Sequence, residues 1–388
     1  MIKTTTKNNI IVQRICQLLQ VLSENNLFYR NYLETPINED NFDNIYKSLP
    51  VINKSIIKKN KNTYFSNMEG IDLITEFTSG STGEPFICYK TRMERNTYSL
   101  RLWKERKRID AKVSPHNFLE LFDTSTKRFN INFVDLSDEN LHKIFSLLSK
   151  IKPRWLCLSP TMALYYAKFH AIHQYNLDSI KYLELQGEYI DDTVRDMIEQ
   201  AFQAQTILHY GLRECWTVAY ECGYRKLHVL DDHFLIDNQS EHLLVTSAIS
   251  QYMPVIKYNT GDIGKIHLLD RCKCGKTNTY ILNLSNARQI QRLQKNSIGN
   301  IIYKKIIKNV ISHFHNDDSL ILAFSVQESD GNYMQINIEK GSGYTLDVEK
   351  EILKNVRTYF GEGINVHINY NYRPVISNTG KQTELLML

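Results

Sequence analysis

Serine, threonine and glycine dominate one short segment of the chain, Thr78-Ser79-Gly80-Ser81-Thr82-Gly83. Glycine has no Cβ, so the backbone amides of such a loop can approach phosphate oxygens closely while the neighbouring hydroxyls donate to them. The segment lacks the Gly-Lys-Ser/Thr ending of a P-loop, which argues against an ordinary P-loop NTPase. Two interpretations remain, a phosphate-binding loop and a plain hairpin turn rich in turn-forming residues.

Three further segments carry side chains suited to a nucleotide and its metal ion. In the segment from His209 to Glu214, Tyr210 suits stacking on a base, and the Glu214 carboxylate suits Mg²⁺. The stretch Tyr258-Asn259-Thr260-Gly261-Asp262 predicts a tight turn whose carboxylate can accept from both hydroxyls of a ribose. Gly380-Lys381 adds a cation near the C-terminus. Taken singly, each segment also has an ordinary explanation as a surface turn, a structural Gly-Asp turn or a solvated tail.

Cysteine and histidine form a separate group of possible metal ligands, namely Cys222, His228, Cys272 and Cys274. Cys272-Lys273-Cys274-Gly275 predicts a tight knuckle, and we expect the other two ligands to come from a neighbouring strand pair. Three thiolates and one imidazole are a typical donor set for tetrahedral zinc. Because all four positions would be filled by protein, such a zinc would be structural and not catalytic. Reduced thiols without metal are the alternative.

The elements that must position these residues follow from the hydrophobic pattern. Residues 71–77 and 86–89 are strand-like, which places the Ser/Thr/Gly loop at the tip of a hairpin. Between residues 155 and 260, short strands alternate with helices: strands 155–158, 182–185 and 206–210, and helices 160–174 and 191–203. This alternation predicts a largely parallel α/β sheet. Tyr210 then lies at the end of a buried strand, where ligand sites of open α/β sheets gather.

The C-terminal part of the sequence has a different pattern. A polar stretch at about 285–300 predicts a linker, and it is followed by three expected strands and one amphipathic helix: strands 320–326, 334–338 and 364–368, and helix 346–360. We therefore predict an α/β protein with mixed, largely parallel sheets in a large N-terminal domain, residues 1–286. A small α+β domain, residues 287–388, would carry Lys381.

Composition sets broad limits on function. The 388 residues are 42% hydrophobic, which suffices for a large core and a second module. The net charge of +5 fits an anionic nucleotide or carrier as well as nucleic acid. We expect neither a signal peptide nor a membrane anchor, because the apolar run 10–21 is interrupted by polar side chains. Seven cysteines without framework spacing predict reduced thiols and a cytoplasmic protein.

The order of these motifs resembles the adenylate-forming superfamily of acyl-CoA synthetases and adenylation domains. The resemblance is greatest to its phenylacetate-CoA ligase-like branch, which includes capsule-biosynthesis adenylating proteins, and it covers nearly the whole chain. The stretch from Pro254 to Asp262 is the most specific part. Similar segments also occur elsewhere: Leu49 to Lys54, Gln186-Gly187-Glu188 and Tyr220-Glu221-Cys222-Gly223.

The resemblance implies a role for each candidate side chain. The loop would bind phosphate, chiefly through Ser79, Ser81, Thr82 and Gly83, which lie beside Thr78 and Gly80. Tyr210 and Gly211 would border the adenine. Asp262 and Arg288 would hold the ribose. Glu214 would hold Mg²⁺, and Lys381 would contact the substrate carboxylate and the α-phosphate. Gly187 and Glu188 would lie beside the adenine or the acyl pocket.

The same resemblance implies ATP and Mg²⁺ as cofactors and a small carboxylic acid as substrate. The carboxylate would attack the α-phosphorus and release pyrophosphate, with cations and amides stabilising the transition state. The acyl group would then pass to coenzyme A or to the phosphopantetheine of an acyl or peptidyl carrier protein. Phe122, Cys215 and Trp216 are candidates for lining an apolar acyl pocket, which favours an aryl or other apolar acid.

Two departures from the family pattern bear on the second reaction step. Ala287-Arg288 replaces the usual Gly-Arg, and Gln289-Ile290-Gln291 lacks the acidic hinge residue expected there. Arg213 occupies a position usually held by a small hydroxyl residue, so its cation is a candidate for contact with phosphate or substrate. An adenylating ligase that transfers to an amine or hydroxyl therefore remains an alternative. A non-catalytic, zinc-containing nucleotide or nucleic-acid binding protein on a degenerate adenylating fold is another, although it leaves Glu214, Asp262 and Lys381 unexplained.

Overall fold

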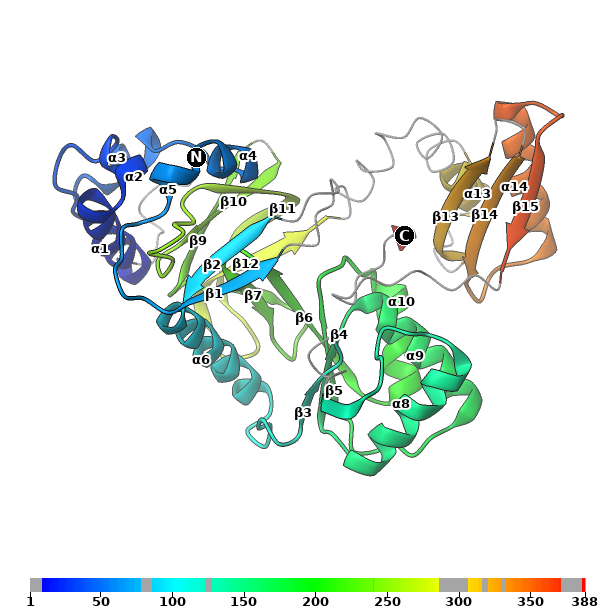
Figure 1. Ribbon diagram of the computed structural model, residues 1–388. Helices are drawn as coiled ribbons and strands as arrows, with labels where there is room; N and C mark the ends of the chain where they lie inside the picture. The colour runs from blue at the N-terminus through cyan, green and yellow to red at the C-terminus, as the bar shows by residue number, and fades with distance from the viewer. Residues whose placement is uncertain are drawn as a thin grey trace. The chain divides into compact units, whose positions relative to one another are not determined.

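The computed structural model describes eight ranges of the chain: residues 9–77, 86–122, 128–239, 241–285, 306–315, 320–329, 333–370 and 386–387. The chain divides into two compact units. Their helices and strands are labelled in Figure 1. The first unit consists of Met1–Val113 and Ile207–Leu284, and the second of Ser114–Thr206 and Ser285–Leu388. Both units are therefore assembled from segments that are separated in the sequence.

The described part of the first unit contains six helices: α1 (Asn9–Asn25), α2 (Leu27–Arg30), α3 (Phe42–Ser48), α4 (Lys54–Lys59), α5 (Lys61–Tyr64) and α6 (Arg92–Ile109). In α1, apolar residues recur at helical spacing, and Ile15, Leu19 and Leu22 are fully buried. A capping box starts α6, because the Thr91 hydroxyl accepts from the Glu94 amide and the Glu94 carboxylate accepts from the Thr91 amide.

Strands β1 (Leu73–Phe77) and β2 (Ile87–Thr91) form an antiparallel pair in the first unit. Leu73 lies opposite Thr91, and Phe77 lies opposite Ile87. The hairpin predicted around the Ser/Thr/Gly segment is thus confirmed in its two strands. The segment between them, residues 78–85, lies outside the described residues.

The remaining strands of the first unit pair antiparallel throughout, in the order β6-β7-β8-β12-β11-β10-β9. Their bounds are β6 (Gln205–Leu212), β7 (Trp216–Glu221), β8 (Leu227–Val229), β9 (Phe234–Gln239), β10 (His242–Ser247), β11 (Tyr258–Arg271) and β12 (Thr277–Leu284). The connections are mostly short turns, and a parallel crossover needs roughly a dozen residues or more. Antiparallel pairing follows directly from this connectivity.

The first segment of the second unit alternates strands and helices: β3 (Phe118–Glu120), α8 (Asp138–Ile151), β4 (Trp155–Leu158), α9 (Pro160–His173), β5 (Tyr182–Gln186) and α10 (Asp192–Phe202). Strands β3, β4 and β5 pair in parallel, as expected for βαβ units. The α/β class predicted from the sequence is confirmed. The parallel share of the sheet is smaller than predicted, because the strands after β6 return through turns instead of crossover helices.

The second segment of this unit contains α13 (Lys308–His313), β13 (Ile321–Ser329), β14 (Tyr333–Lys340), α14 (Leu346–Phe360), β15 (Asn365–Asn369) and β16 (Leu386–Met387). The four strands follow the order β15-β14-β13-β16. Apolar side chains of the sheet and both helices form one buried cluster that includes Val310, Phe324, Ile336 and Ile352. The α+β composition expected for this part of the sequence is confirmed.

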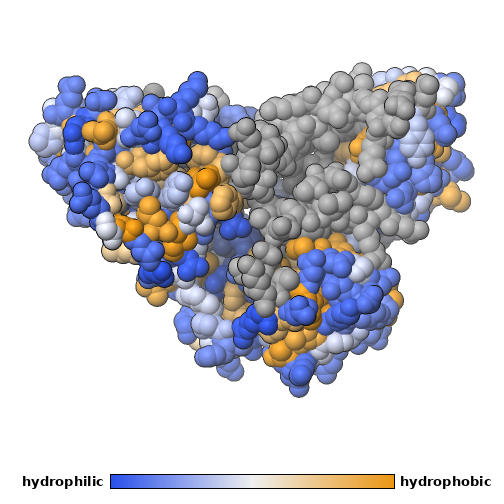
Figure 2. Space-filling model, viewed as in Figure 1, coloured by the Kyte–Doolittle hydropathy of each residue, from blue (hydrophilic) through white to orange (hydrophobic). Residues whose placement is uncertain are grey.

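Surface polarity varies over the molecule. On the face shown in Figure 2, hydrophilic residues predominate and apolar residues gather in separate patches. The exposed apolar side chains of α6 include Met93 and Leu100, which are 65% and 72% exposed. Within the described ranges, every helix is too short or too polar to serve as a bilayer span.

Candidate functional site

Two of the motifs singled out in the sequence lie side by side in the first unit. The Tyr210 hydroxyl, on β6, donates a hydrogen bond to Asp262 Oδ2, on β11, over 3.0 Å. Burial, followed by the Asp262 charge, raises the pKa of Tyr210 well above its usual value, so the phenol remains a donor. The expected adenine-side and ribose-side residues are therefore in direct contact.

Glu214 is a buried carboxylate, 4% exposed, in the turn between β6 and β7. The Tyr258 hydroxyl donates to Glu214 Oε1 over 2.6 Å, and Lys54 Nζ lies 3.5 Å from the same oxygen. Burial and the Glu214 charge raise the pKa of Tyr258, which keeps it protonated. No side chain or amide in the described ranges is bonded to Glu214 Oε2.

The segment that precedes α4 reaches this site through the main chain. The Ile52 amide donates to the Lys257 carbonyl over 3.1 Å, and the Asn259 amide donates to the Ile52 carbonyl over 2.7 Å. The Asn53 side chain caps α4, which puts Lys54 at its first helical position. Sequence reasoning noted this segment as a similarity but assigned no role to Lys54, whose partner is 160 positions away.

Backbone geometry in the β6–β7 turn is tightly constrained. Trp216 has a φ of 58°, which is unusual for a residue with a side chain. A Cβ added at Gly211 would lie 2.7 Å from the Trp216 carbonyl oxygen, so glycine is required there. Arg213 is exposed in the same turn. Local strain of this kind tends to occur at functional sites.

Gly187 and Glu188 follow β5 in the second unit. Glu188 Oε2 accepts hydrogen bonds from the Thr161 amide over 3.1 Å and from the Thr161 hydroxyl over 2.7 Å. This carboxylate thus holds the first turn of α9. Its expected place beside adenine or the acyl pocket stays a prediction.

Several predicted site residues lie outside the described residues: Thr78, Ser79, Gly80, Ser81, Thr82, Gly83, Arg288 and Lys381. Their roles in binding phosphate, ribose and substrate stay predictions. Of the residues expected at an acyl pocket, Cys215 is fully buried. Trp216 is partly covered by the Arg95 guanidinium, which lies 5.2 Å from the centre of the indole ring.

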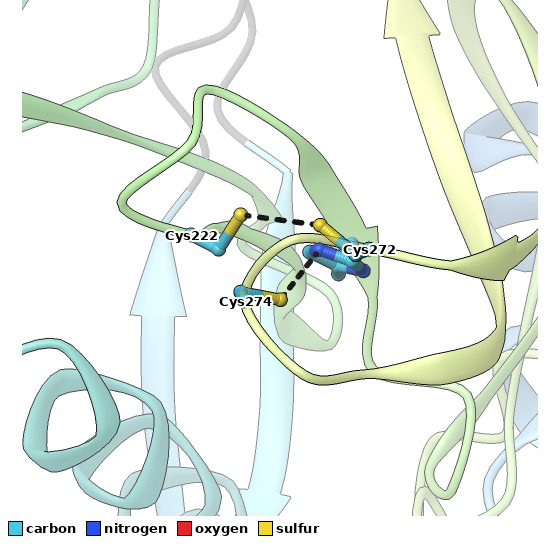
Figure 3. A group of neighbouring side chains, drawn as sticks. Cys222, Cys272 and Cys274 are labelled. Carbon is cyan, nitrogen blue, oxygen red and sulfur yellow. Dashed lines mark hydrogen bonds between the residues drawn. The ribbon is translucent and has the colours of Figure 1, made fainter.

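The predicted metal ligands Cys222, His228, Cys272 and Cys274 come together in the first unit. Their ligand atoms all lie within 4.8 Å of one another. Figure 3 shows the three cysteine side chains converging from two loops. The Cys222 and Cys272 sulfurs are 3.9 Å apart, and Cys274 Sγ is 3.4 Å from His228 Nε2. A tetrahedral zinc with Zn–S bonds of ~2.3 Å separates its ligand atoms by about 3.8 Å, so the spacing fits.

Main-chain hydrogen bonds shape both cysteine loops for this arrangement. The Cys222 amide donates to the Lys226 carbonyl over 3.0 Å, and the Cys272 amide donates to the Lys276 carbonyl over 2.8 Å. His228 Nδ1 lies 3.2 Å from the Thr279 hydroxyl, which directs Nε2 toward the sulfurs. Burial, followed by the Lys276 charge, lowers the pKa of His228 to about 4. The imidazole is therefore neutral at pH 7, as a metal ligand must be.

No protein-family model and no curated protein sequence matches this chain. Among solved structures, it is similar to 2-hydroxyisobutyryl-CoA ligase in the postadenylation state with R3-HIB-AMP. That comparison has 13% identity and a TM-score of 0.63, and it covers 96% of this chain and 88% of the ligase. An open conformation of the same ligase with 2-HIB-AMP and CoA gives a TM-score of 0.55 at 15% identity, over 71% of this chain and 72% of the other.

A third similar structure is the anthranilate CoA ligase AuaEII in complex with anthranoyl-AMP. The TM-score is 0.50 at 12% identity, and the match covers 82% of this chain and 66% of that one. At such low sequence identity, structural similarity shows a shared fold and nothing about function. These comparisons therefore show that the chain has the fold of these acyl-CoA ligases.

Proposed function

We propose that this protein activates a carboxylic acid with ATP, forming an acyl-adenylate and pyrophosphate, and then transfers the acyl group to a thiol. One observation carries the proposal: Tyr210 contacts Asp262 and Glu214 contacts Tyr258, in a chain with an acyl-CoA ligase fold. Motifs about fifty residues apart thus meet, which supports a shared role in binding a nucleotide. A fold alone would not support this conclusion.

Asp262 binds the ribose. Its carboxylate accepts from sugar hydroxyls, and the Tyr210 hydroxyl, which donates to Oδ2, orients it. The Tyr210 ring then borders the adenine, next to Gly211, whose lack of a Cβ leaves room for the Trp216 carbonyl. These residues bind and orient the nucleotide and take no part in bond making.

Glu214 binds the magnesium ion. Mg²⁺ in nucleotide sites usually has one or two carboxylate ligands, with phosphates and waters completing the octahedron. Tyr258 and Lys54 both lie at Oε1, which leaves Oε2 as the oxygen directed to the ion. The bound ion would supply neutralisation of the phosphate charge. The protein contributes position, and the residues at 78–83 add amides and hydroxyls for the phosphates.

Chemistry at the α-phosphorus requires orientation and charge stabilisation but no protein nucleophile. Substrate carboxylate oxygen bonds to phosphorus as the bond to pyrophosphate breaks. Lys381 and Arg213 supply cations to the reacting carboxylate and phosphate. The acid is an aryl or other apolar acid, and the acceptor is coenzyme A or a carrier-protein phosphopantetheine. Membership of the phenylacetate-CoA ligase-like branch is part of this proposal.

Zinc at Cys222, His228, Cys272 and Cys274 completes the proposal. The spacing of the sulfurs and the neutral imidazole support it. With four protein ligands the ion has no open position, so its role is to hold two loops of the first unit together.

Detection of the intermediate by mass spectrometry tests the proposed reaction. The protein would be incubated with ATP, Mg²⁺ and pooled acids, and coenzyme A, a carrier protein or hydroxylamine would then be added in parallel. We expect an acyl-AMP that is consumed by a thiol. Consumption by hydroxylamine alone would favour transfer to an amine or hydroxyl, and ATP binding without any acyl-AMP from a broad pool of acids would contradict the proposal.

A further inference from the structure

A buried cation on β2 has no part in the reaction proposed above. Lys90 is 2% exposed, and its ammonium lies 2.8 Å from Glu76 Oε2 on β1. The same ammonium donates to the main-chain carbonyl of Arg213. Trp216 Nε1 donates to both Glu76 oxygens, over 3.1 and 2.9 Å. Three side chains therefore form one connected group.

This group joins two parts of the first unit. One is the hairpin of β1 and β2, whose strands flank residues 78–85. The other is the β6–β7 turn, in which Arg213 directly precedes Glu214. A hydrogen bond to the Arg213 carbonyl fixes the peptide plane between these two residues, and so fixes where the Glu214 side chain starts.

The turn needs such support from outside. Trp216 adopts a left-handed backbone and Gly211 closely approaches its carbonyl, so the turn is held in a conformation that an isolated chain would rarely adopt. Burial raises the pKa of Glu76, but the Lys90 charge and hydrogen bonds from Lys90 and Trp216 outweigh burial and lower it overall. Glu76 is therefore an anion at neutral pH and a lasting partner for Lys90.

We propose that Lys90, held by Glu76 and Trp216, is a positioning residue that fixes the Glu214 turn relative to strands β1 and β2. The inference rests on the proposed function, because it takes Glu214 as the Mg²⁺ ligand. Lys90 itself contacts neither metal nor substrate. By fixing the turn, it holds the Glu214 carboxylate in one position for Mg²⁺·ATP.

The test compares Lys90→Met with a matched control two positions away, at the start of α6. Arg92 forms an exposed ion pair with Asp72 over 2.6 Å, with both side chains more than 60% exposed, so Arg92→Met removes a cation without disturbing the turn. We expect Lys90→Met to raise the Mg²⁺ concentration for half-maximal pyrophosphate release and the KM for ATP by about tenfold or more. The KM for the acid should change by less than about threefold, and Arg92→Met should match the wild type.

A double variant separates positioning from charge balance. Lys90→Met alone leaves the Glu76 carboxylate buried without its cation, which destabilises the fold. Combining it with Glu76→Gln removes both charges and should recover the melting temperature, but not the link to the Arg213 carbonyl. We therefore expect the double variant to keep raised constants for Mg²⁺ and ATP. Wild-type constants in a stable double variant, or an equal loss in all kinetic constants, would overturn the inference.

Direct binding distinguishes this inference from the proposed reaction. Calorimetry with Mg²⁺ and α,β-methylene-ATP reports nucleotide affinity without turnover. If the wild type binds the analogue and the double variant binds it about tenfold more weakly, the positioning role stands even if no acid is ever adenylated. Equal affinity in both proteins would overturn it, whatever the activity assay shows.

Discussion

Glu214 is the side chain on which the proposed metal site depends most. Its carboxylate is almost fully buried, and both of its partners in the described chain, Tyr258 and Lys54, are at Oε1. A buried carboxylate without a full set of partners is expensive unless a cation completes it. The arrangement therefore suits a metal ligand better than a purely structural ion pair.

Removing the charge of Glu214 tests this role. Glu214→Gln keeps the size and one acceptor for Tyr258, but the amide is a poor Mg²⁺ ligand. We expect acid-dependent pyrophosphate release to fall by about 100-fold or more, ~2.7 kcal/mol in the transition state. Glu241→Gln, which neutralises an exposed carboxylate directly before β10, serves as the control. A Glu214→Gln enzyme with a wild-type rate and Mg²⁺ dependence would remove Glu214 from the metal site.

Among the described elements, the β6–β7 connection has a strict steric requirement at Gly211. Gly211→Ala introduces a Cβ 2.7 Å from the Trp216 carbonyl oxygen, and a main-chain atom cannot easily move away. We expect a loss of about 1 to 3 kcal/mol in the free energy of unfolding, measured by urea denaturation, together with reduced activity.

Gly363→Ala is the matched control, because no atom lies within 4 Å of a Cβ placed there. Replacing glycine at a compatible position is neutral or stabilises by up to about 1 kcal/mol. If both substitutions changed the free energy of unfolding equally, the close approach at Gly211 would not be the cause of the loss.

The two cysteine loops form the second element with a testable role. We expect the purified protein to contain one zinc per chain and Cys272→Ser to lose it, since three remaining ligands bind zinc far more weakly. Chelation of the metal should lower the apparent Tm by about 5 °C or more. Cys16 is a buried residue of α1 and is not one of the four ligands, so the Cys16→Ala protein should retain zinc. Metal-free protein with an unchanged Tm after chelation would contradict a structural zinc.

Local patterns predicted the elements better than their assembly. The strand pattern on either side of residues 78–83 gave the β1–β2 hairpin correctly, because alternation and turn chemistry act over a few residues. The sheet was predicted to be largely parallel, whereas the strands after β6 pair antiparallel. The length of the connections decides whether neighbouring strands pair parallel or antiparallel. Connection lengths are harder to predict from the sequence than the strands themselves.

Contacts between residues far apart in the sequence limited how much of the candidate site could be predicted. Tyr210, Glu214 and Asp262 were identifiable because they lie in recognisable motifs. Lys90 and Glu76 were not, since their partners Arg213 and Trp216 lie 123 and 140 positions away. An isolated lysine in a strand carries no sign of its role until the fold supplies a carbonyl and a carboxylate.

At the scale of the whole molecule, both compact units are made of separated segments of the chain. The proposed nucleotide contacts of Tyr210, Glu214, Tyr258 and Asp262, and the proposed zinc, all belong to the first unit. The first unit should therefore bind nucleotide and zinc through its own contacts. Lys381, on a segment of the second unit, is the proposed catalytic contribution from elsewhere in the chain.

Pyrophosphate release from ATP and Mg²⁺, measured across hydroxy, aryl, fatty and amino acids, is the most direct test of the central claim. We predict release that depends on one class of acid and on Mg²⁺, and that is largely lost in Glu214→Gln. Absence of acid-dependent release across the panel, from a folded protein that binds ATP, would contradict acyl-adenylate formation.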